Sequence, residues 1–368
     1  EVVVDLFAAE TAALLAWTDY LLGERLSQVT AQLRPRIQHE INARILTPCL
    51  ERDDYSWMGN GLQGNLRRVN NWNPWICSNW LACVLLMEAD AARRVQSVQK
   101  IMQTVDHFID PYPKDGGCDE GPGYWGRAGA SLFDTLELLY SASNGKLTVY
   151  DQPLIQEIGR FIHRVQIADN YYINFADAPA LVTPDATIVY LYGQRIQDAE
   201  MSGLGEWLWQ RQLASLRSQD ETSAANAKNV ATRDVAPSMA RTLRSLFAPP
   251  PENSQAAAPL PQDSWLPEIE VMVARDAAGS KDGLFVAAKG GNNNESHNHN
   301  DIGTFIIFND GKPVMIDAGV EFYTAKTFGP QRYEIWTMQS AYHTLLPTID
   351  GVQQAPGEQF KATQVSYH

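Results

Sequence analysis

Apolar residues recur at every third or fourth position from Asp5 to about Phe247, a spacing that predicts a run of amphipathic helices. Asn73-Pro74 and Thr183-Pro184 have the form of an N-cap followed by proline at the first helical position, and Asp151 is a third N-cap candidate. We expect roughly nine or ten helices, joined by short loops as in stacked antiparallel hairpins. The clearest ranges are 7–23, 36–47, 74–89, 91–109, 124–142, 153–167, 184–197, 204–217 and 237–247.

The periodicity changes after a stretch at 249–264 that contains Pro249-Pro-Pro251 and Ala256-Ala-Ala-Pro259. Beyond it, apolar and polar residues alternate, which predicts strands, and Asn309-Asp310-Gly311 has the form of a hairpin turn. The expected strands are 268–275, 284–288, 304–308 and 314–318. The pattern therefore predicts an α+β chain with a helical domain at 1–250, a linker at 251–265 and an antiparallel β domain at 266–368.

The composition is that of a globular protein long enough for two domains, with 368 residues, of which 45% are hydrophobic and 20% charged. A formal net charge of −14 argues against a nucleic-acid partner and against a polyanion held by a generally basic surface. An anionic substrate would therefore need a local cluster of polar groups. Four cysteines lack the spacing of a metal site and are expected to be buried thiols: Cys49, Cys77, Cys83 and Cys118.

No run approaches the roughly twenty apolar residues that a membrane-spanning helix needs. The first residues, Glu1 to Asp5, lack the basic start of a signal peptide, so we expect that a leader has been removed. The strand pattern has only begun to develop before His368, so we also expect the β domain to continue beyond that residue.

The most polar segment, Glu295-Ser-His-Asn-His-Asn-Asp301, precedes a predicted buried strand. Seven consecutive polar residues are costly to fold unless they bind something. In an extended conformation His297 and His299 face the same way, which suits one metal ion, or one metal ligand beside a catalytic imidazole. A solvated turn with incidental histidines is the alternative.

Asp317 and His343 would complete a His/Asp/His zinc site with His299, if the fold brings the three together. A simple hairpin about residues 309–310 would pair Thr304 with Asp317 and leave His299 about five residues out of register, on the wrong face. A bulge or bend at Gly303 would be needed to correct this.

Two further constellations lie in the helical region. Tyr124 follows a loop of four glycines and a proline, which allows close approach to a ligand and suits a proton-transfer tyrosine; simple packing on a neighbour is the alternative. In Asn70-Asn-Trp-Asn-Pro-Trp75, Asn73 is interpreted as an N-cap, whereas Asn71 has no such role and offers an amide donor to a substrate carboxylate.

These residue types suit β-elimination next to a uronate. The C5 proton is poorly acidic until hydrogen-bond donors neutralise the carboxylate, and the departing 4-oxygen must then be protonated or stabilised. An amide, a histidine and one or two tyrosines would suffice.

The sequence resembles the heparinase II/III-like polysaccharide lyases and the related oligoalginate lyases. Ser296-His-Asn-His-Asn-Asp-Ile-Gly-Thr-Phe305, Met315-Ile-Asp-Ala-Gly319 and Ala341-Tyr-His-Thr344 look like their zinc-bearing β-sandwich. Asp115-Gly-Gly-Cys-Asp-Glu-Gly-Pro-Gly-Tyr124 is similar to the segment that carries their catalytic tyrosine, and residues 70–75 are similar to their Asn-Asn-His segment. The resemblance implies an α/α toroid followed by an antiparallel β-sandwich, with the active cleft between them.

The resemblance also implies a role for each matching residue. Asn71 would neutralise the carboxylate, Tyr124 would transfer the proton and His297 would be the partner acid or base. Tyr333 would be a second tyrosine of the cleft, and a structural zinc ion would bind His299, Asp317 and His343. The match departs from the alginate-type motif at one position, because Trp72 stands where that motif has a histidine, so no neutralising histidine carries over. Asn73, Trp72, Arg127 and Arg332 are candidate substrate-binding residues, although a surface ion pair is an alternative for each arginine.

The implied partner is an anionic uronate polysaccharide, with a glycosaminoglycan such as heparan sulfate, hyaluronan or chondroitin favoured over alginate or gellan. The implied location is secreted or periplasmic in a bacterium, and homodimerisation is left open. Two rivals remain: a glycoside hydrolase using Asp119 and Glu120, which are poorly placed as an adjacent pair, and a non-catalytic carbohydrate-binding protein.

Overall fold

The computed structural model describes residues 2–60, 69–217, 238–344, 348–350 and 352–368. The chain forms two compact units, each built from segments that are separate in the sequence. The first comprises Glu1–Tyr112, Arg127–Val149 and Ala236–Ala248, and the second comprises Pro113–Gly126, Tyr150–Val235 and Pro249–His368.

The first unit is helical and is centred on α4 (Trp72–Met87), which is buried along most of its length and packs against α1, α5 and α7. An ion-pair network attaches α12 to α7, because Arg241 and Arg244 both contact the largely buried carboxylate of Asp134. The helices of this unit are α1 (Leu6–Val29), α2 (Leu33–Ile41), the π-helical turn η1 (Asn42–Leu46), α3 (Thr47–Glu51), the 3-10 turn η2 (Ser56–Met58), α4, α5 (Ala91–Ile109), α7 (Gly129–Ala142) and α12 (Met239–Phe247).

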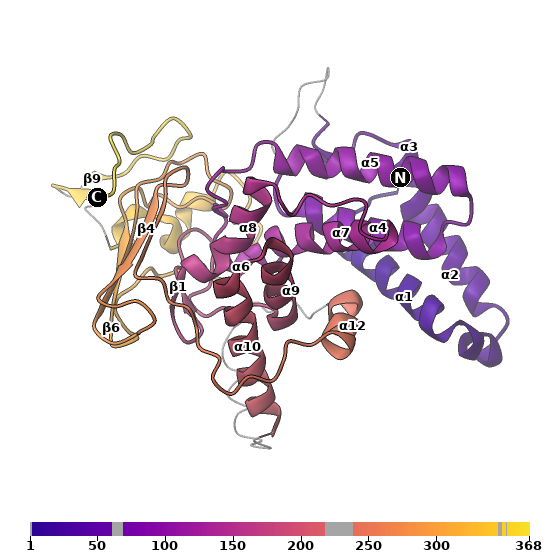
Figure 1. Cartoon of the computed structure of the whole chain (residues 1–368). Helices are drawn as coiled ribbons and strands as arrows, with labels where there is room; N and C mark the ends of the chain where they lie inside the picture. The colour runs from indigo at the N-terminus through magenta and orange to yellow at the C-terminus, as the bar shows by residue number, and fades with distance from the viewer. Residues whose placement is uncertain (1, 61–68, 218–237, 345–347, 351) are drawn as a thin grey trace. The chain divides into compact units, whose positions relative to one another are not determined.

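The second unit combines helices with antiparallel strands. Helices α8 (Pro153–Arg164), α9 (Ala186–Ile196) and α10 (Ala199–Arg217) pack on one another (Figure 1), and α6 (Pro122–Trp125) contacts α8. Strands β1 (Gln166–Ala168) and β2 (Tyr171–Tyr172) form a hairpin after α8. The buried Arg275 donates to the carbonyls of Gln166 and Ile167, so it joins this hairpin to the main sheet.

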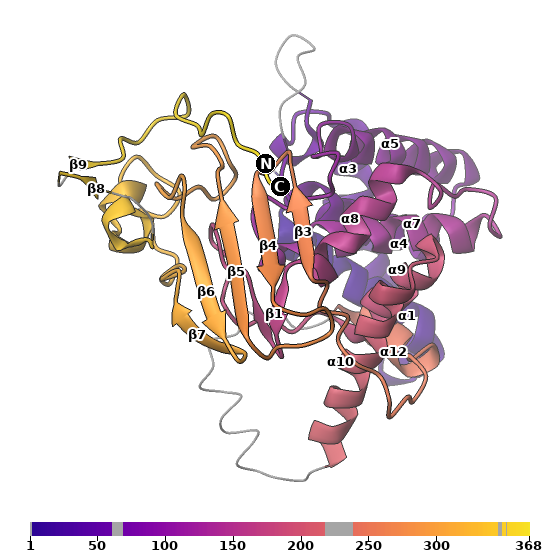
Figure 2. The same ribbon diagram turned by 60° about the vertical axis from the view of Figure 1, so that its left-hand side comes forward.

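The main sheet has five antiparallel strands in the order β3-β4-β5-β6-β7 (Figure 2). Alternate residues of its central strands are buried, including Val273, Ala287 and Ile306, so one face of the sheet belongs to the core. The strands are β3 (Asp263–Leu266), β4 (Val271–Arg275), β5 (Leu284–Lys289), β6 (Phe305–Asn309) and β7 (Lys312–Met315). Three 3-10 turns, η4 (Arg332–Glu334), η5 (Trp336–Met338) and η6 (Ser340–Tyr342), and a short pair, β8 (Thr348–Ile349) and β9 (Val352–Gln353), follow.

The α+β class and the antiparallel sheet are confirmed, and the four cysteines are buried free thiols as expected. The closure of the helices into a toroid and of the strands into a sandwich stays a prediction, as do the boundaries of the two domains. Three of the four residues of strand β3 fall in the predicted linker 251–265. Within the described part of the chain, no helix is both long and apolar enough to cross a membrane.

The predicted N-caps were wrong. Helix α4 begins at Trp72, so Asn73 lies inside it, and its side-chain amide donates to the carbonyls of Trp57 and Thr104. Helix α9 is capped by Asp185 rather than Thr183, and α8 follows Gln152 rather than Asp151. A proline marks the start of a helix only within a few residues, because it fits any position of the first turn.

Candidate active site and metal centre

The glycine-rich loop before α6 lies directly on the segment 174–179 of the same unit. Gly121 has a φ of +88°, and a Cβ added there would come within 2.6 Å of the Cβ of Ala178. A Cβ on Gly123 would come within 2.5 Å of Pro179. Only glycine allows this approach, which brings Glu120 and Tyr124 close to Asp177.

Asp177 lies at the centre of the site and is completely buried. Its two oxygens accept hydrogen bonds from four side chains: His297 Nδ1 at 2.6 Å, His299 Nε2 at 2.9 Å, Arg332 Nη2 at 2.9 Å and Tyr323 OH at 3.0 Å. Burial alone would raise the pKa of this carboxyl, but the hydrogen bonds from the two histidines and the charge of Arg332 hold it far below its usual range. An ionised carboxylate only accepts, so each histidine nitrogen facing it carries a hydrogen.

His297 is placed between two carboxylates. Its Nδ1 faces Asp177, and its Nε2 lies 3.2 Å from Oε2 of Glu120. The backbone of His297 is left-handed, with a φ of +57°. Burial lowers the pKa of this imidazole, but the hydrogen bonds to Asp177 and Glu120 outweigh burial and raise it to about 9. The geometry therefore favours a positively charged His297.

Two tyrosines stand beside His297. The ring of Tyr124 is 4.6 Å from the imidazole, and its hydroxyl forms a short hydrogen bond with that of Tyr323. Tyr323 was not predicted as a site residue, although it follows the predicted metal ligand Asp317 by only six residues. Tyr333, which the resemblance implied, instead accepts a hydrogen bond from the amide of Asn298 at 2.9 Å.

The three predicted metal ligands meet in a buried cluster. His299, Asp317 and His343 each offer one ligand atom, and these atoms lie within 4.8 Å of one another. A one-residue shift between β6 and β7, after Phe308 pairs with Pro313, and the positive φ of Gly303 alter the simple hairpin geometry. Gly303 lies in the turn before β6, outside the strand, and the three ligand atoms converge.

The donor set fits a zinc ion. Among the described residues, Nδ1 of His299 and Nε2 of His343 are buried without a hydrogen-bond partner. Two imidazole nitrogens and a carboxylate are a common zinc donor set. The opposite nitrogen of His299 donates to Asp177, as metal-bound histidines generally donate to an acceptor.

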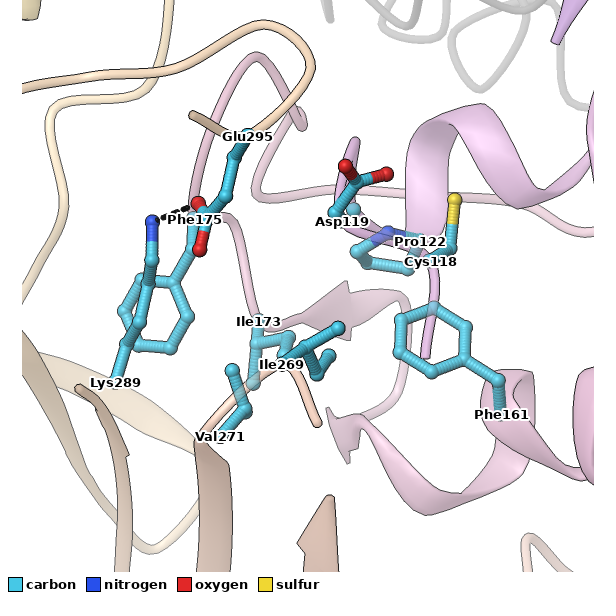
Figure 3. A pocket seen from close by; sticks show the side chains of 11 residues that line it. Cys118, Asp119, Pro122, Phe161, Ile173, Phe175, Ile269, Val271, Lys289 and Glu295 are labelled. Carbon is cyan, nitrogen blue, oxygen red and sulfur yellow. Dashed lines mark ion pairs between the residues drawn. The ribbon is translucent and has the colours of Figure 1, made fainter. Parts of the chain in front are cut away.

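A buried ion-pair cluster supports the histidine loop at both ends. Lys289, at the end of β5, contacts Glu295 at 2.5 Å and Asp301 at 2.9 Å, and all three are almost inaccessible. Figure 3 shows Lys289 and Glu295 on one side of a small pocket, with Asp119 and Cys118 on the other. Oδ2 of Asp119 accepts a hydrogen bond from the backbone N–H of Ser296, next to His297.

The remaining predicted residues of the site belong to the first unit. Asn71 is buried at the N-cap position of α4, and Trp72 is partly exposed beside it. Arg127 is buried with its guanidinium 3.9 Å from the centroid of the Trp75 ring, and burial lowers its pKa to about 10. Their roles toward a substrate stay predictions.

Arg332 does not form a surface ion pair, which was the alternative interpretation of this residue, because its partner Asp177 is fully buried. Its three guanidinium nitrogens donate to Asp177, to the carbonyl of Asn298 and to the carbonyl of Thr327. It therefore holds the histidine loop against Asp177. Asp177 itself was missed, although an acidic residue in Phe175-Ala-Asp-Ala-Pro179 is a visible polar interruption of an apolar run.

Comparison with solved structures shows similarity to structures described as heparinase III and as heparan sulfate lyase. One is a heparinase III, with a TM-score of 0.53 and 12% identity, covering 85% of this chain and 41% of that chain. A second heparinase III has a TM-score of 0.51 and 14% identity over 86% of this chain and 40% of that one. A mutant heparan sulfate lyase from Pedobacter heparinus has a TM-score of 0.50 and 16% identity, covering 85% of this chain and 40% of that one.

These likenesses concern the fold. The chain spans about 40% of the length of the lyases it matches. No protein-family model matches the sequence, and neither does any curated protein.

Proposed function

We propose that this chain is the catalytic part of a polysaccharide lyase that cleaves a uronic-acid-containing polymer by β-elimination. The observation that carries the proposal is the contact of Tyr124 with both Tyr323 and His297, beside the buried carboxylate of Asp177. The proposal includes an α/α toroid followed by an antiparallel β-sandwich, and a secreted or periplasmic location in a bacterium.

The chemistry requires one proton to leave C5 and one to reach the departing 4-oxygen. We assign the proton transfer to Tyr124, because the adjacent positive charge of His297 favours a phenolate, the form that accepts the C5 proton. The C5–H electrons form the C4–C5 double bond as the C4–O4 bond breaks. The proton then passes to O4 from Tyr124 or its hydrogen-bonded neighbour Tyr323.

The substrate carboxylate must be neutralised for this reaction, and we assign that task to the amide of Asn71, with Trp72 and Arg127 as further binding candidates. The predicted candidate Asn73 is less suited, because it is buried and its amide already donates to two backbone carbonyls. For the second tyrosine, the hydrogen bond to Tyr124 favours Tyr323 over Tyr333. Zinc held by His299, Asp317 and His343 would supply a structural cross-link that keeps the histidine loop in shape.

The favoured substrates are glycosaminoglycans, because two of the similar structures are described as heparinase III and a third as a heparan sulfate lyase. Alginate and gellan-type polymers come next. The net charge of −14 favours recognition by local groups over a broad basic surface.

The test is incubation of the purified protein with heparan sulfate, hyaluronan, chondroitin sulfate, alginate and gellan while the ultraviolet absorbance of unsaturated uronate is followed. We expect one polymer to give a rise that Tyr124→Phe lowers by about 10²–10⁴-fold. Tyr20→Phe, at a 65% exposed position of α1, is the matched control and should retain full activity.

Three results would contradict the proposal. New reducing ends without absorbance would indicate a glycoside hydrolase. Saturable binding without turnover would indicate a carbohydrate-binding protein. An unchanged rate in Tyr124→Phe would remove the assigned proton-transfer residue.

A further inference from the structure

The buried carboxylate of Asp177 is shared between the metal centre and the candidate catalytic histidine. Its Oδ1 accepts from His299 Nε2 at 2.9 Å, and its Oδ2 accepts from His297 Nδ1 at 2.6 Å. We propose that Asp177 is a positioning residue that couples occupancy of the metal site to the orientation of His297. The consequence for turnover rests on the proposed function, but the coupling itself does not.

The surroundings of Asp177 leave its carboxylate one arrangement. The side chain is fully buried, Arg332 donates to Oδ1 at 2.9 Å, and Tyr323 donates to Oδ2 at 3.0 Å. A rotation that improves the bond to one histidine weakens the bond to the other, because both bonds use the same rigid carboxylate plane. The orientations of His297 and His299 are therefore linked through one side chain.

The metal acts on this link through the other face of His299. Among the described residues, Nδ1 of His299 has no hydrogen-bond partner, although the ring is buried. A zinc ion at Nδ1 would fix the ring, and the fixed ring would present its Nε2–H to Asp177. The ion would thus add a second fixed contact to a ring that already donates to Asp177 at 2.9 Å.

A second route between the histidines must be separated from this one. His297 and His299 are two residues apart, so the backbone alone can transmit a disturbance at the metal. Replacing Asp177 removes the carboxylate route and leaves the backbone route intact. Glu120 provides a comparison, because its buried carboxylate contacts Nε2 of His297 at 3.2 Å, whereas Asp177 contacts both histidines directly.

The experiment uses the full chain loaded with zinc, with zinc affinity measured by chelator competition. We expect Asp177→Asn to weaken zinc binding by about 10–100-fold, because an amide cannot accept from both histidines. Glu120→Gln should weaken zinc binding less than Asp177→Asn does, since its carboxylate acts on His299 through His297 and Asp177 rather than by the direct bond that Asp177 makes. Unchanged affinity in Asp177→Asn would overturn the proposal.

The nitrogen-15 NMR signals of the His297 imidazole provide a second measurement, which a purely structural role of Asp177 would leave unchanged. In the wild type, removal of zinc should shift the ring signals of His297, and in Asp177→Asn this response should disappear. A response that persists in the variant would assign the coupling to the backbone and overturn the proposal, as would a wild type that does not respond.

Folding of each variant is checked by circular dichroism. If Asp177→Asn does not fold, Asp177→Glu retains the buried charge but displaces both oxygens, and it is subject to the same expectations and the same contrary outcomes. Neither measurement uses a polysaccharide, so failure of the lyase assay and failure of the coupling are distinguishable.

Discussion

At the scale of single residues, the site depends on which tyrosine contacts Tyr124. Tyr323 bonds both Tyr124 and Asp177, whereas Tyr333 bonds Asn298. We expect Tyr323→Phe to lower kcat by about tenfold, because the loss of one to two hydrogen bonds is worth about 1.4 kcal/mol in the transition state. Tyr333→Phe is the matched comparison, and a larger loss of kcat there would return the second role to Tyr333.

The buried imidazole of His163 is expected to make the free energy of unfolding depend on pH. Burial lowers its pKa from 6.5 to about 4, and among the described residues neither ring nitrogen has a hydrogen-bond partner. Between pH 6.5 and about pH 4, the imidazole of His163 is protonated in the unfolded chain but neutral in the folded chain. The free energy of unfolding therefore falls as pH decreases from about 6.5 to about 4. At about 1.4 kcal/mol per pKa unit, the loss approaches roughly 3 kcal/mol.

Urea unfolding across this pH range measures the effect. We expect His163→Leu to flatten the acid limb of the stability curve, and His39→Leu, at an exposed position of α2, to leave it unchanged. Equal slopes in wild type and His163→Leu would show that another group controls the acid limb.

The candidate site shows how far residues can be predicted from local sequence. His297 and His299 were predicted because they lie in one dense polar segment. Asp317 and His343 were predicted because they follow that segment and complete a His/Asp/His donor set. Asp177 was not predicted, because it lies 120 residues before His297 and only the fold makes it the common acceptor of His297 and His299. A single carboxylate in a loop has no periodicity to indicate its partner.

At the scale of elements, the histidine loop is anchored by Lys289 at the end of β5. Its ammonium contacts the carboxylates of Glu295 and Asp301, and its own side chain is 3% exposed. Lys289→Met would leave two buried carboxylates uncompensated, so we expect a loss of about 3–5 kcal/mol in the free energy of unfolding. Lys281→Met, which breaks an exposed pair with Asp169, should cost less than about 1 kcal/mol.

Urea denaturation of both variants decides this prediction, and similar small losses would show that the cluster contributes little net stability.

The helices and strands themselves were largely predictable, because helical and strand periodicity reflects burial of one face. Their ends were less so: the expected helix 124–142 is interrupted between α6 and α7, since close packing of the loop near Asp177 decides the course of the chain there.

At the scale of the whole molecule, the two units mix early and late segments, so Pro113–Gly126 joins Pro249–His368 in the second unit. Composition along the sequence cannot reveal this arrangement, because the proline- and alanine-rich stretch at 249–264 marks only one of the points where the chain passes from one unit to the other. The catalytic candidates Tyr124 and His297 nevertheless fall in one unit. Their partnership was implied by the resemblance to the lyases, since their separation of 173 residues in the sequence gives no indication of it.

The candidate metal site gives a prediction for the stability of the molecule. Its ligands, His299, Asp317 and His343, come from three separate parts of the second unit, so a bound zinc ion would cross-link them. An ion that binds only the folded chain stabilises it by about 2.7 kcal/mol at a concentration of 100 times Kd. For a unit of this size we expect removal of zinc to lower Tm by roughly 5–10 °C.

Differential scanning calorimetry with chelator, and again after zinc is restored, measures this shift. His343→Ala should lower Tm and abolish the response to chelator, because the ring supplies a ligand to the cluster. His39→Ala, on the surface of α2, should respond as the wild type does. A wild-type Tm that is the same with and without chelator would mean that the unpartnered nitrogens of His299 and His343 do not hold a stabilising ion. The histidine loop would then be held by the contacts of Lys289, Asp177 and Arg332.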